Sequence, residues 1–173
     1  MTTMQRYTAA AGLALVLACG ESGADHDATA QANAKRPPAA SVDMCGLLTQ
    51  EEATGILGTP SAAPQKGAGN SCTFAAQNGR GEIMLHMLPL TFGSEEEFHA
   101  FLVKDTESMN ERLKKDLGDK VKLSTVDPVP EVGTPAYYVD PTLIILKDGR
   151  VLSILAADRK QAVAVAARAE PRF

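Results

Sequence analysis

Hydrophobic and polar residues follow two different periods beyond about residue 43, and together these predict a mixed α+β domain. Residues 82–88 are largely apolar on both alternating faces, which is typical of a strand inside a sheet, and the apolar runs 142–147 and 150–155 are expected to be a pair of strands. Apolar residues spaced by three, four and seven between Ser94 and Gly118 predict a long amphipathic helix. The expected buried face of that helix consists of Phe98, Phe101, Leu102, Met109, Leu113 and Leu117. We therefore predict an antiparallel β-sheet of about five to six strands with helices packed on its faces.

Cap and turn signals divide this pattern into elements. Thr49-Gln50-Glu51-Glu52 and Ser94-Glu95-Glu96-Glu97 each have the capping-box pattern that begins a helix. Asp158 is the expected cap of a last helix. Asn78-Gly79 and Asp148-Gly149 are typical of the tight turns that join antiparallel strands. The sequence therefore predicts three helices and two hairpins.

Three further segments are assigned by composition and alternation. Residues 120–126 alternate, and we expect them to form a strand. Residues 59–71 are expected to be a loop. Residues 127–135 contain three prolines, which cannot donate to a sheet, and we expect an ordered but irregular segment.

The N-terminal region has the features of an export signal. Ala9–Ala18 is an unbroken run of apolar and small residues that follows Arg6. The run is too short to cross a bilayer, which needs roughly 20 residues, but it has the length of a secretory h-region. The sequence that ends it, Val16-Leu17-Ala18-Cys19-Gly20, resembles a bacterial lipobox. The resemblance implies that residues 1–18 are a lipoprotein signal peptide and that Cys19 carries a diacylglycerol. The alternatives are an ordinary signal peptide with a bystander cysteine, or a buried helix.

The lipobox implies a location outside the cytoplasm. Residues 19–42 contain almost no large apolar side chain and are expected to be a flexible, lipid-anchored tether to a domain at 43–173. The acyl chains would attach the protein to a membrane, facing the periplasm or the cell exterior. An aspartate directly after the acylated cysteine resembles an inner-membrane retention signal. This chain has Gly20 at that position, and by this analogy the outer membrane is favoured in a Gram-negative host.

The cysteine count agrees with this location. Once Cys19 is acylated, Cys45 and Cys72 remain as an even pair in an oxidising compartment. We predict that these two form a disulfide between the start of the first helix and the sheet. The alternative is two free, buried thiols.

Net charge argues against some classes of partner. The formal charge is −4 at pH 7. Removal of residues 1–18 would also remove the positive charge of Arg6 and so make the remaining chain more acidic. An acidic surface without a basic patch does not favour nucleic acid or electrostatic binding to anionic lipid head groups.

Several segments together resemble a known family. They include Cys45-x-Leu47-Leu48-Thr49, Cys72-x-Phe74, Val129-Pro130-Glu131-Val132-Gly133 and the closing 146–154. They are similar to bacterial cell-envelope lipoproteins of unknown function, of the actinobacterial type with a double-cysteine domain. The resemblance covers about residues 45–167 and implies a PsbP-like α/β/α sandwich. It implies no catalytic residues.

A direct search for catalytic or ligand-binding patterns finds none. The sequence lacks the common zinc-protease, serine-hydrolase, phosphate-loop and Cys-x-x-Cys motifs. His26, His86 and His99 fall on three different segments without ligand spacing. We therefore expect no metal, no cofactor and no enzymatic activity.

Three functions from different classes follow from these observations. The first is a binding or assembly module for an unknown envelope protein, with loop 127–135, Glu131, Tyr137 and Tyr138 as its contact surface, because aromatic residues are enriched at interfaces. In the alternative, both tyrosines pack under the loop. The second function is a carrier of a small apolar ligand between sheet and helices, and the third, least favoured, is an enzyme.

Overall fold

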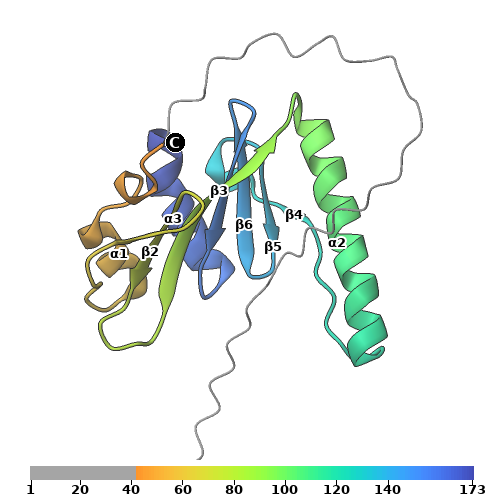
Figure 1. Ribbon diagram of the computed structural model, residues 1–173, viewed down its shortest axis with the longest axis horizontal. Coiled ribbons are helices and arrows are strands. Elements are labelled where there is room, and N and C mark those ends of the chain that lie inside the picture. Colours follow the sequence, from red (N-terminus) through yellow and green to blue (C-terminus); the bar gives the residue numbers. More distant parts are fainter. Residues whose placement is uncertain (1–41) are drawn as a thin grey trace, which may run out of the picture. The chain divides into compact units, whose positions relative to one another are not determined.

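A seven-stranded antiparallel sheet in the order β1-β2-β3-β7-β6-β5-β4 forms the centre of the domain (Figure 1). The structure is a computed structural model and describes residues 42–173. The strands are β1 Gln65–Gly67, β2 Ser71–Ala75, β3 Glu82–Thr91, β4 Asp127–Pro128, β5 Ala136–Val139, β6 Thr142–Lys147 and β7 Arg150–Leu155. The helices are α1 Gln50–Leu57, α2 Glu95–Leu117 and α3 Arg159–Ala169, with 3-10 turns η1 Met44–Gly46, η2 Pro130–Val132 and η3 Glu170–Arg172. The predicted α+β class is confirmed, and two short edge strands, β1 and β4, raise the strand number above the expected five to six.

The main core lies between one face of the sheet and helices α1 and α3, which lie side by side (Figure 1). The register places alternate residues of neighbouring strands opposite each other on this face, for example Leu85 opposite Ile154 and Ile145 opposite Leu152. All four side chains are fully buried. α3 covers them with a small-residue face, Ala162, Val165, Ala166 and Ala169. Small side chains let the helix approach the sheet closely.

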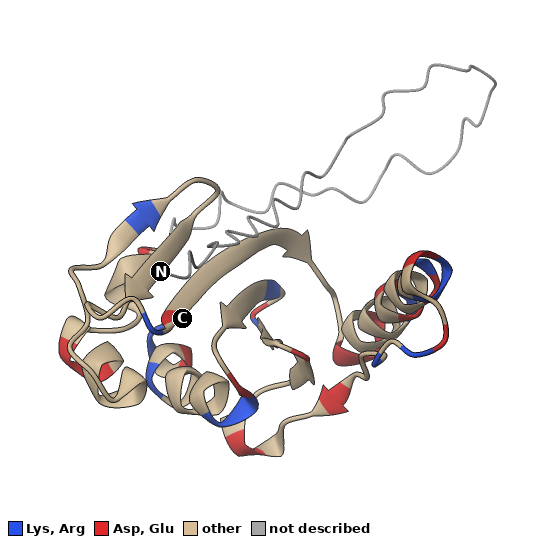
Figure 2. Cartoon of the chain, turned by 90° about the horizontal axis from the view of Figure 1, so that it is seen from below, with Lys and Arg blue, Asp and Glu red and all other residues tan. Residues whose placement is uncertain are grey.

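A second, smaller core lies on the other face of the sheet under the first turns of α2. Phe98 and Leu102 of α2 pack there against Tyr137, Leu146 and Val151. Figure 2 shows α2 apart from α1 and α3. Other apolar residues of α2 are more exposed than the sequence pattern predicted. Phe101, Met109 and Leu117, which we expected in the core, are 38%, 39% and 66% exposed.

The predicted strand at 120–126 is wrong, and Asn110 gives the physical reason. The Asn110 side chain donates to the Ser124 carbonyl at 2.8 Å and accepts from the Ser124 amide at 3.0 Å. At Ser124, the backbone groups that a strand would pair with its neighbour are therefore bound to α2 instead. The chain reaches the sheet only at β4. In the expected loop 59–71, by contrast, residues 65–67 do pair with β2.

The two ends of the described chain are fastened to the same core. Cys45 in η1 forms a disulfide with Cys72 in β2, as predicted. At the other end, Phe173 is buried, its ring lies under the guanidinium of Arg150, and its carbonyl accepts from that side chain at 3.1 Å. Both ends therefore contribute to the packing that holds α1 and α3 on the sheet.

Candidate binding surface

The two predicted tyrosines lie next to each other in β5 but on opposite faces of the sheet. Tyr137 belongs to the cluster under α2 and Tyr138 to the main core. They are 7% and 8% exposed, so their rings are packing residues. This is the arrangement of the alternative, in which both tyrosines pack. Only their hydroxyl groups reach polar partners.

Each tyrosine hydroxyl donates a hydrogen bond to a carboxylate at the rim of the sheet. The Tyr137 hydroxyl bonds Glu95 Oε1 at 3.0 Å, and the Tyr138 hydroxyl bonds Asp140 Oδ1 at 3.2 Å. Burial raises the pKa of both phenols above the ordinary value of 10.0, and the adjacent carboxylates raise it further. Both tyrosines are therefore neutral donors at physiological pH.

The apolar residues of loop 127–135 are buried and anchor the loop to the domain. Val129 and Val132 are buried, and the Val129 amide donates to the Ala136 carbonyl at 2.9 Å. Arg159 Nη2 donates to the Pro128 carbonyl at 3.1 Å, with its guanidinium 5.8 Å from the Tyr138 ring centre. The loop is thus tied to β5 and to α3.

The upper side of the same loop is exposed. Pro128, Pro130, Glu131 and Gly133 all face solvent. Glu131 lies in η2, and Gly133 ends that turn with a φ of 81°, a left-handed conformation that favours glycine. The structure therefore presents Glu131 on a ridge whose shape is fixed by buried neighbours.

A hollow of about 370 Å³ lies beside this ridge. Its lining combines loop residues with Glu95 from the first turn of α2 and with Tyr137. The Thr134 hydroxyl oxygen is buried there without a hydrogen-bond partner in the described chain. Tyr138, on the opposite face, does not line the hollow. Sequence reasoning missed Glu95 because its position, in a run of acids at a helix start, is fully explained by the helix dipole.

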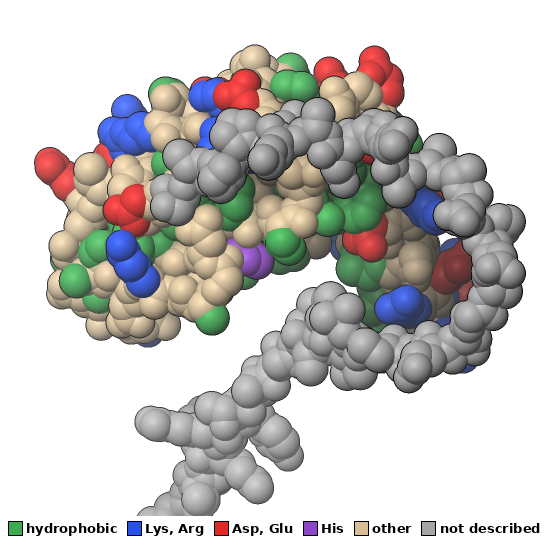
Figure 3. Space-filling model, turned by 45° about the horizontal axis from the view of Figure 1, so that its top comes forward, with side chains coloured by type: hydrophobic (Ala, Val, Ile, Leu, Met, Phe, Trp, Pro, Cys, Tyr) green, Lys and Arg blue, Asp and Glu red, His purple; other side chains and the backbone are tan. Residues whose placement is uncertain are grey.

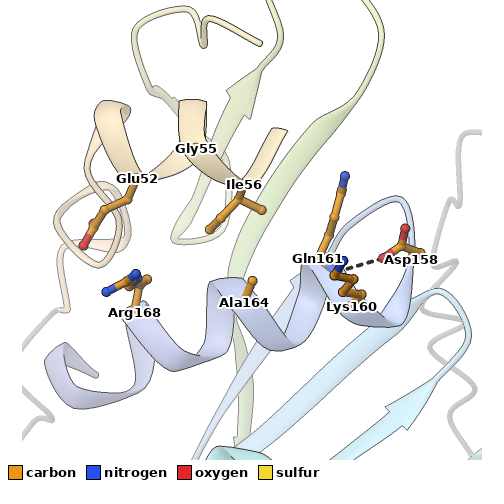
Figure 4. Close-up of a pocket in the computed structure, with 8 residues that line it drawn as sticks. All are labelled: Glu52, Gly55, Ile56, Asp158, Lys160, Gln161, Ala164 and Arg168. Carbon is orange, nitrogen blue, oxygen red and sulfur yellow. Dashed lines mark hydrogen bonds between the residues drawn. The ribbon is translucent and has the colours of Figure 1, made fainter. Parts of the chain in front are cut away.

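A second depression separates α1 from α3 (Figure 4). It measures about 630 Å³ and carries both acidic and basic side chains. Gly55 and Ile56 of α1 lie opposite Ala164 of α3 across it. No sequence pattern indicated this cleft, because its two walls are about a hundred residues apart in the chain.

A third feature is the part of the sheet that α2 leaves uncovered. Met84, Ile144 and Leu155 share the α2 face of the sheet with Val151, yet they are only half-buried. Figure 3 shows hydrophobic side chains gathered around a hollow between α2 and the rest of the domain. His86 also lies on this face and is half-exposed.

The remaining predicted residues are the lipidation site and two histidines, His26 and His99. Cys19 lies outside the described residues, as does His26. The ring of His99, which is exposed on α2, lies 5.0 Å from that of Tyr137. Within residues 42–173, no cluster of three or more His, Cys, Asp or Glu side chains is arranged to hold a metal ion. None of the helices in that range has the length and apolar character needed to cross a bilayer.

Comparisons with protein-family models, with curated proteins and with solved structures found no match for this chain.

Proposed function

We propose that this protein is an exported lipoprotein, anchored through Cys19, whose domain at 43–173 is a non-catalytic binding module of the cell envelope. The lipobox-like Val16–Gly20 and the polar tether support the anchor. The Cys45–Cys72 disulfide supports an oxidising compartment, because cytosolic proteins rarely keep such bonds. The module's partner would be a protein of the same compartment.

The observation that carries the binding role is the rigidity of the exposed ridge at 127–135. A flexible loop loses conformational entropy when it binds, which weakens the complex. Here Val129, Val132 and the Arg159 contact already fix the loop in the free protein. Its exposed prolines and Glu131 can therefore contact a partner with little ordering cost.

A site-specific cross-link tests this proposal directly. A photoreactive residue would replace Glu131, and in a matched control it would replace Glu111, which is exposed on α2. After irradiation in the protein's own membranes, we expect one protein adduct from position 131 and none from position 111. The adduct should decrease when Pro130→Ala loosens the ridge. Equal labelling from both positions, or no adduct from position 131, would remove the ridge as the contact surface.

The partly covered sheet face favours a second candidate, a carrier of a small apolar ligand. Exposed apolar patches of this kind often mark ligand or partner sites. If a ligand lies on the part of the sheet that α2 leaves uncovered, Leu155→Asp should abolish binding of a fluorescent fatty acid such as parinaric acid. Leu117→Asp, at the exposed end of α2, should not. Equal binding by both variants, or none by the parent protein, would eliminate the carrier.

A further inference from the structure

The cleft between α1 and α3 has no residue in common with the hollow beside loop 127–135, and it has its own chemistry. Its two facing walls carry small or apolar groups, Gly55 and Ile56 on α1 and Ala164 on α3 (Figure 4). Its volume of about 630 Å³ lies within the range of small-ligand sites.

Gly55 is not required by the fold of this chain. It lies within the helix α1, where glycine destabilises relative to alanine. A Cβ atom built on Gly55 meets no atom within 4 Å, so packing does not exclude a side chain. The missing side chain leaves the backbone of α1 open to close approach from the cleft.

The charges that line the cleft are unequally paired. The Glu52 carboxylate is already bound by Arg172 and by the backbone amide of Thr49. Asp158 Oδ1 accepts a hydrogen bond from the backbone amide of Gln161 at 2.8 Å. By contrast, the side chains of Lys160 and Arg168 have neither an ion-pair partner nor a hydrogen-bond partner among residues 42–173. The cleft therefore offers two free cations.

A third polar group in the cleft lacks a partner. Gln161 Oε1 is buried, and no donor in the described chain reaches it. A buried oxygen of this kind is stabilised when an N–H group binds to it. It lies on α3 between the two cations, which are eight residues and therefore about 12 Å apart along the helix.

We propose that this cleft binds a short acidic peptide segment in extended conformation. Carboxylates of the segment would pair with Lys160 and Arg168. The Gln161 side chain would turn toward the cleft, so that its unpartnered Oε1 accepts a main-chain N–H of the segment. The peptide backbone would lie against Gly55 and Ala164. In an extended chain, about three to four residues span the distance between the two cations.

The probe for this test is the peptide acetyl-Glu-Gly-Gly-Gly-Glu-amide, whose two glutamates lie on the same side of an extended chain. Its neutral control is the Gln-for-Glu analogue. Both would be titrated into the full chain in mild detergent, with amide NMR as the readout. We expect the acidic peptide to shift the Gly55, Gln161 and Ala164 signals. Arg168→Gln should weaken its binding about tenfold or more, as loss of a charged hydrogen-bond donor does. Gly55→Leu should fill the cleft and abolish binding.

Matched variants on α2 separate the cleft from general effects. Arg112→Gln removes an exposed cation and Ala100→Leu adds an exposed leucine, and neither should change peptide binding. The site is rejected if the neutral peptide binds equally well, or if folded Arg168→Gln or Gly55→Leu protein binds like the parent. Free glutarate binding as tightly as the peptide would overturn the peptide assignment. None of these results affects the ridge at 127–135, which the cross-link tests independently.

Discussion

Arg172 holds the Glu52 carboxylate with both terminal guanidinium nitrogens, at 2.7 and 2.8 Å. The same side chain donates to the Leu47 carbonyl at 3.1 Å. Glu52 is also the N3 residue of the α1 capping box, where it accepts from the Thr49 amide at 2.8 Å. One carboxylate therefore both caps the first helix and fixes the last turn of the chain, 120 residues away.

This double role predicts an acid-sensitive component of stability. Hydrogen bonds from Arg172 and from the Thr49 amide lower the pKa of Glu52 from 4.5 to about 2. Because the folded-state pKa is depressed, the contribution is complete above pH 4.5 and is lost as the pH falls toward 2. Urea unfolding at pH 7 should show Glu52→Gln to be less stable than the parent by about 1 kcal/mol.

The neighbouring Glu51→Gln is the control for that variant, since the Glu51 carboxylate has no such contacts with any residue in 42–173. Below pH 4.5 the difference in unfolding free energy between Glu52→Gln and the parent should shrink. A constant difference from pH 7 to pH 3 would contradict the linkage.

Loss of the disulfide should destabilise the domain without changing its fold class. Cys45 and Cys72 are separated by 27 residues, and closing a loop of that length stabilises a protein by about 3–4 kcal/mol. We expect the Cys45→Ser/Cys72→Ser variant to unfold at a correspondingly lower urea concentration. A reductant should lower the urea concentration at which the parent unfolds by a similar amount, and it should not change that of the variant. If reductant shifts both proteins equally, another effect is responsible.

The two packed tyrosines predict destabilisation at high pH. Both folded-state pKa values lie above the ordinary 10.0, so stability is complete below pH 10 and is lost as the pH rises through the folded-state values. In a chain that begins at Cys19, absorbance near 295 nm should show both tyrosines ionising late, together with unfolding. For the Tyr137→Phe/Tyr138→Phe variant, the free energy of unfolding should fall less steeply with rising pH than it does for the parent. Ionisation of Tyr137 and Tyr138 at the ordinary pH, before unfolding, would contradict their burial.

Asn110→Ala should release the segment that runs along α2. The variant loses both hydrogen bonds to the Ser124 backbone, at a cost of about 2 kcal/mol in that segment. Trypsin should then cut faster after Lys120 and Lys122, while the melting temperature changes little. The neighbouring Glu111→Ala serves as a control, and equal cleavage of the two variants would show that Asn110 does not hold the segment.

Local signals in the sequence predicted the elements that depend on local chemistry. Asp148-Gly149 places the β6–β7 turn, with Asp148 at φ 51° and Gly149 at φ 74°. Thr49 and Asp158 cap α1 and α3 through their side chains, as their positions indicated. At α2 the Ser94 side chain caps as expected, but Glu97 reaches back to the Gly93 amide at 2.9 Å.

Features that depend on distant partners could not be predicted. The alternation at 120–126 is real, but the amide of Asn110 competes for its backbone. Residues 65–67 are exposed and polar, so no periodicity marks β1. Adjacent tyrosines in a strand must point to opposite faces, yet only the second core under α2 explains why both are buried.

A native mass spectrum of the protein, extracted in mild detergent from its own membranes, tests the central claim most directly. We predict a chain that begins at an acylated Cys19, contains the Cys45–Cys72 bond, and carries a bound protein that is lost in the Glu131→Lys variant but kept in Glu111→Lys. A bare chain that begins elsewhere would contradict the anchor. An acylated chain with only a small apolar molecule bound would contradict the binding-module function and favour the carrier.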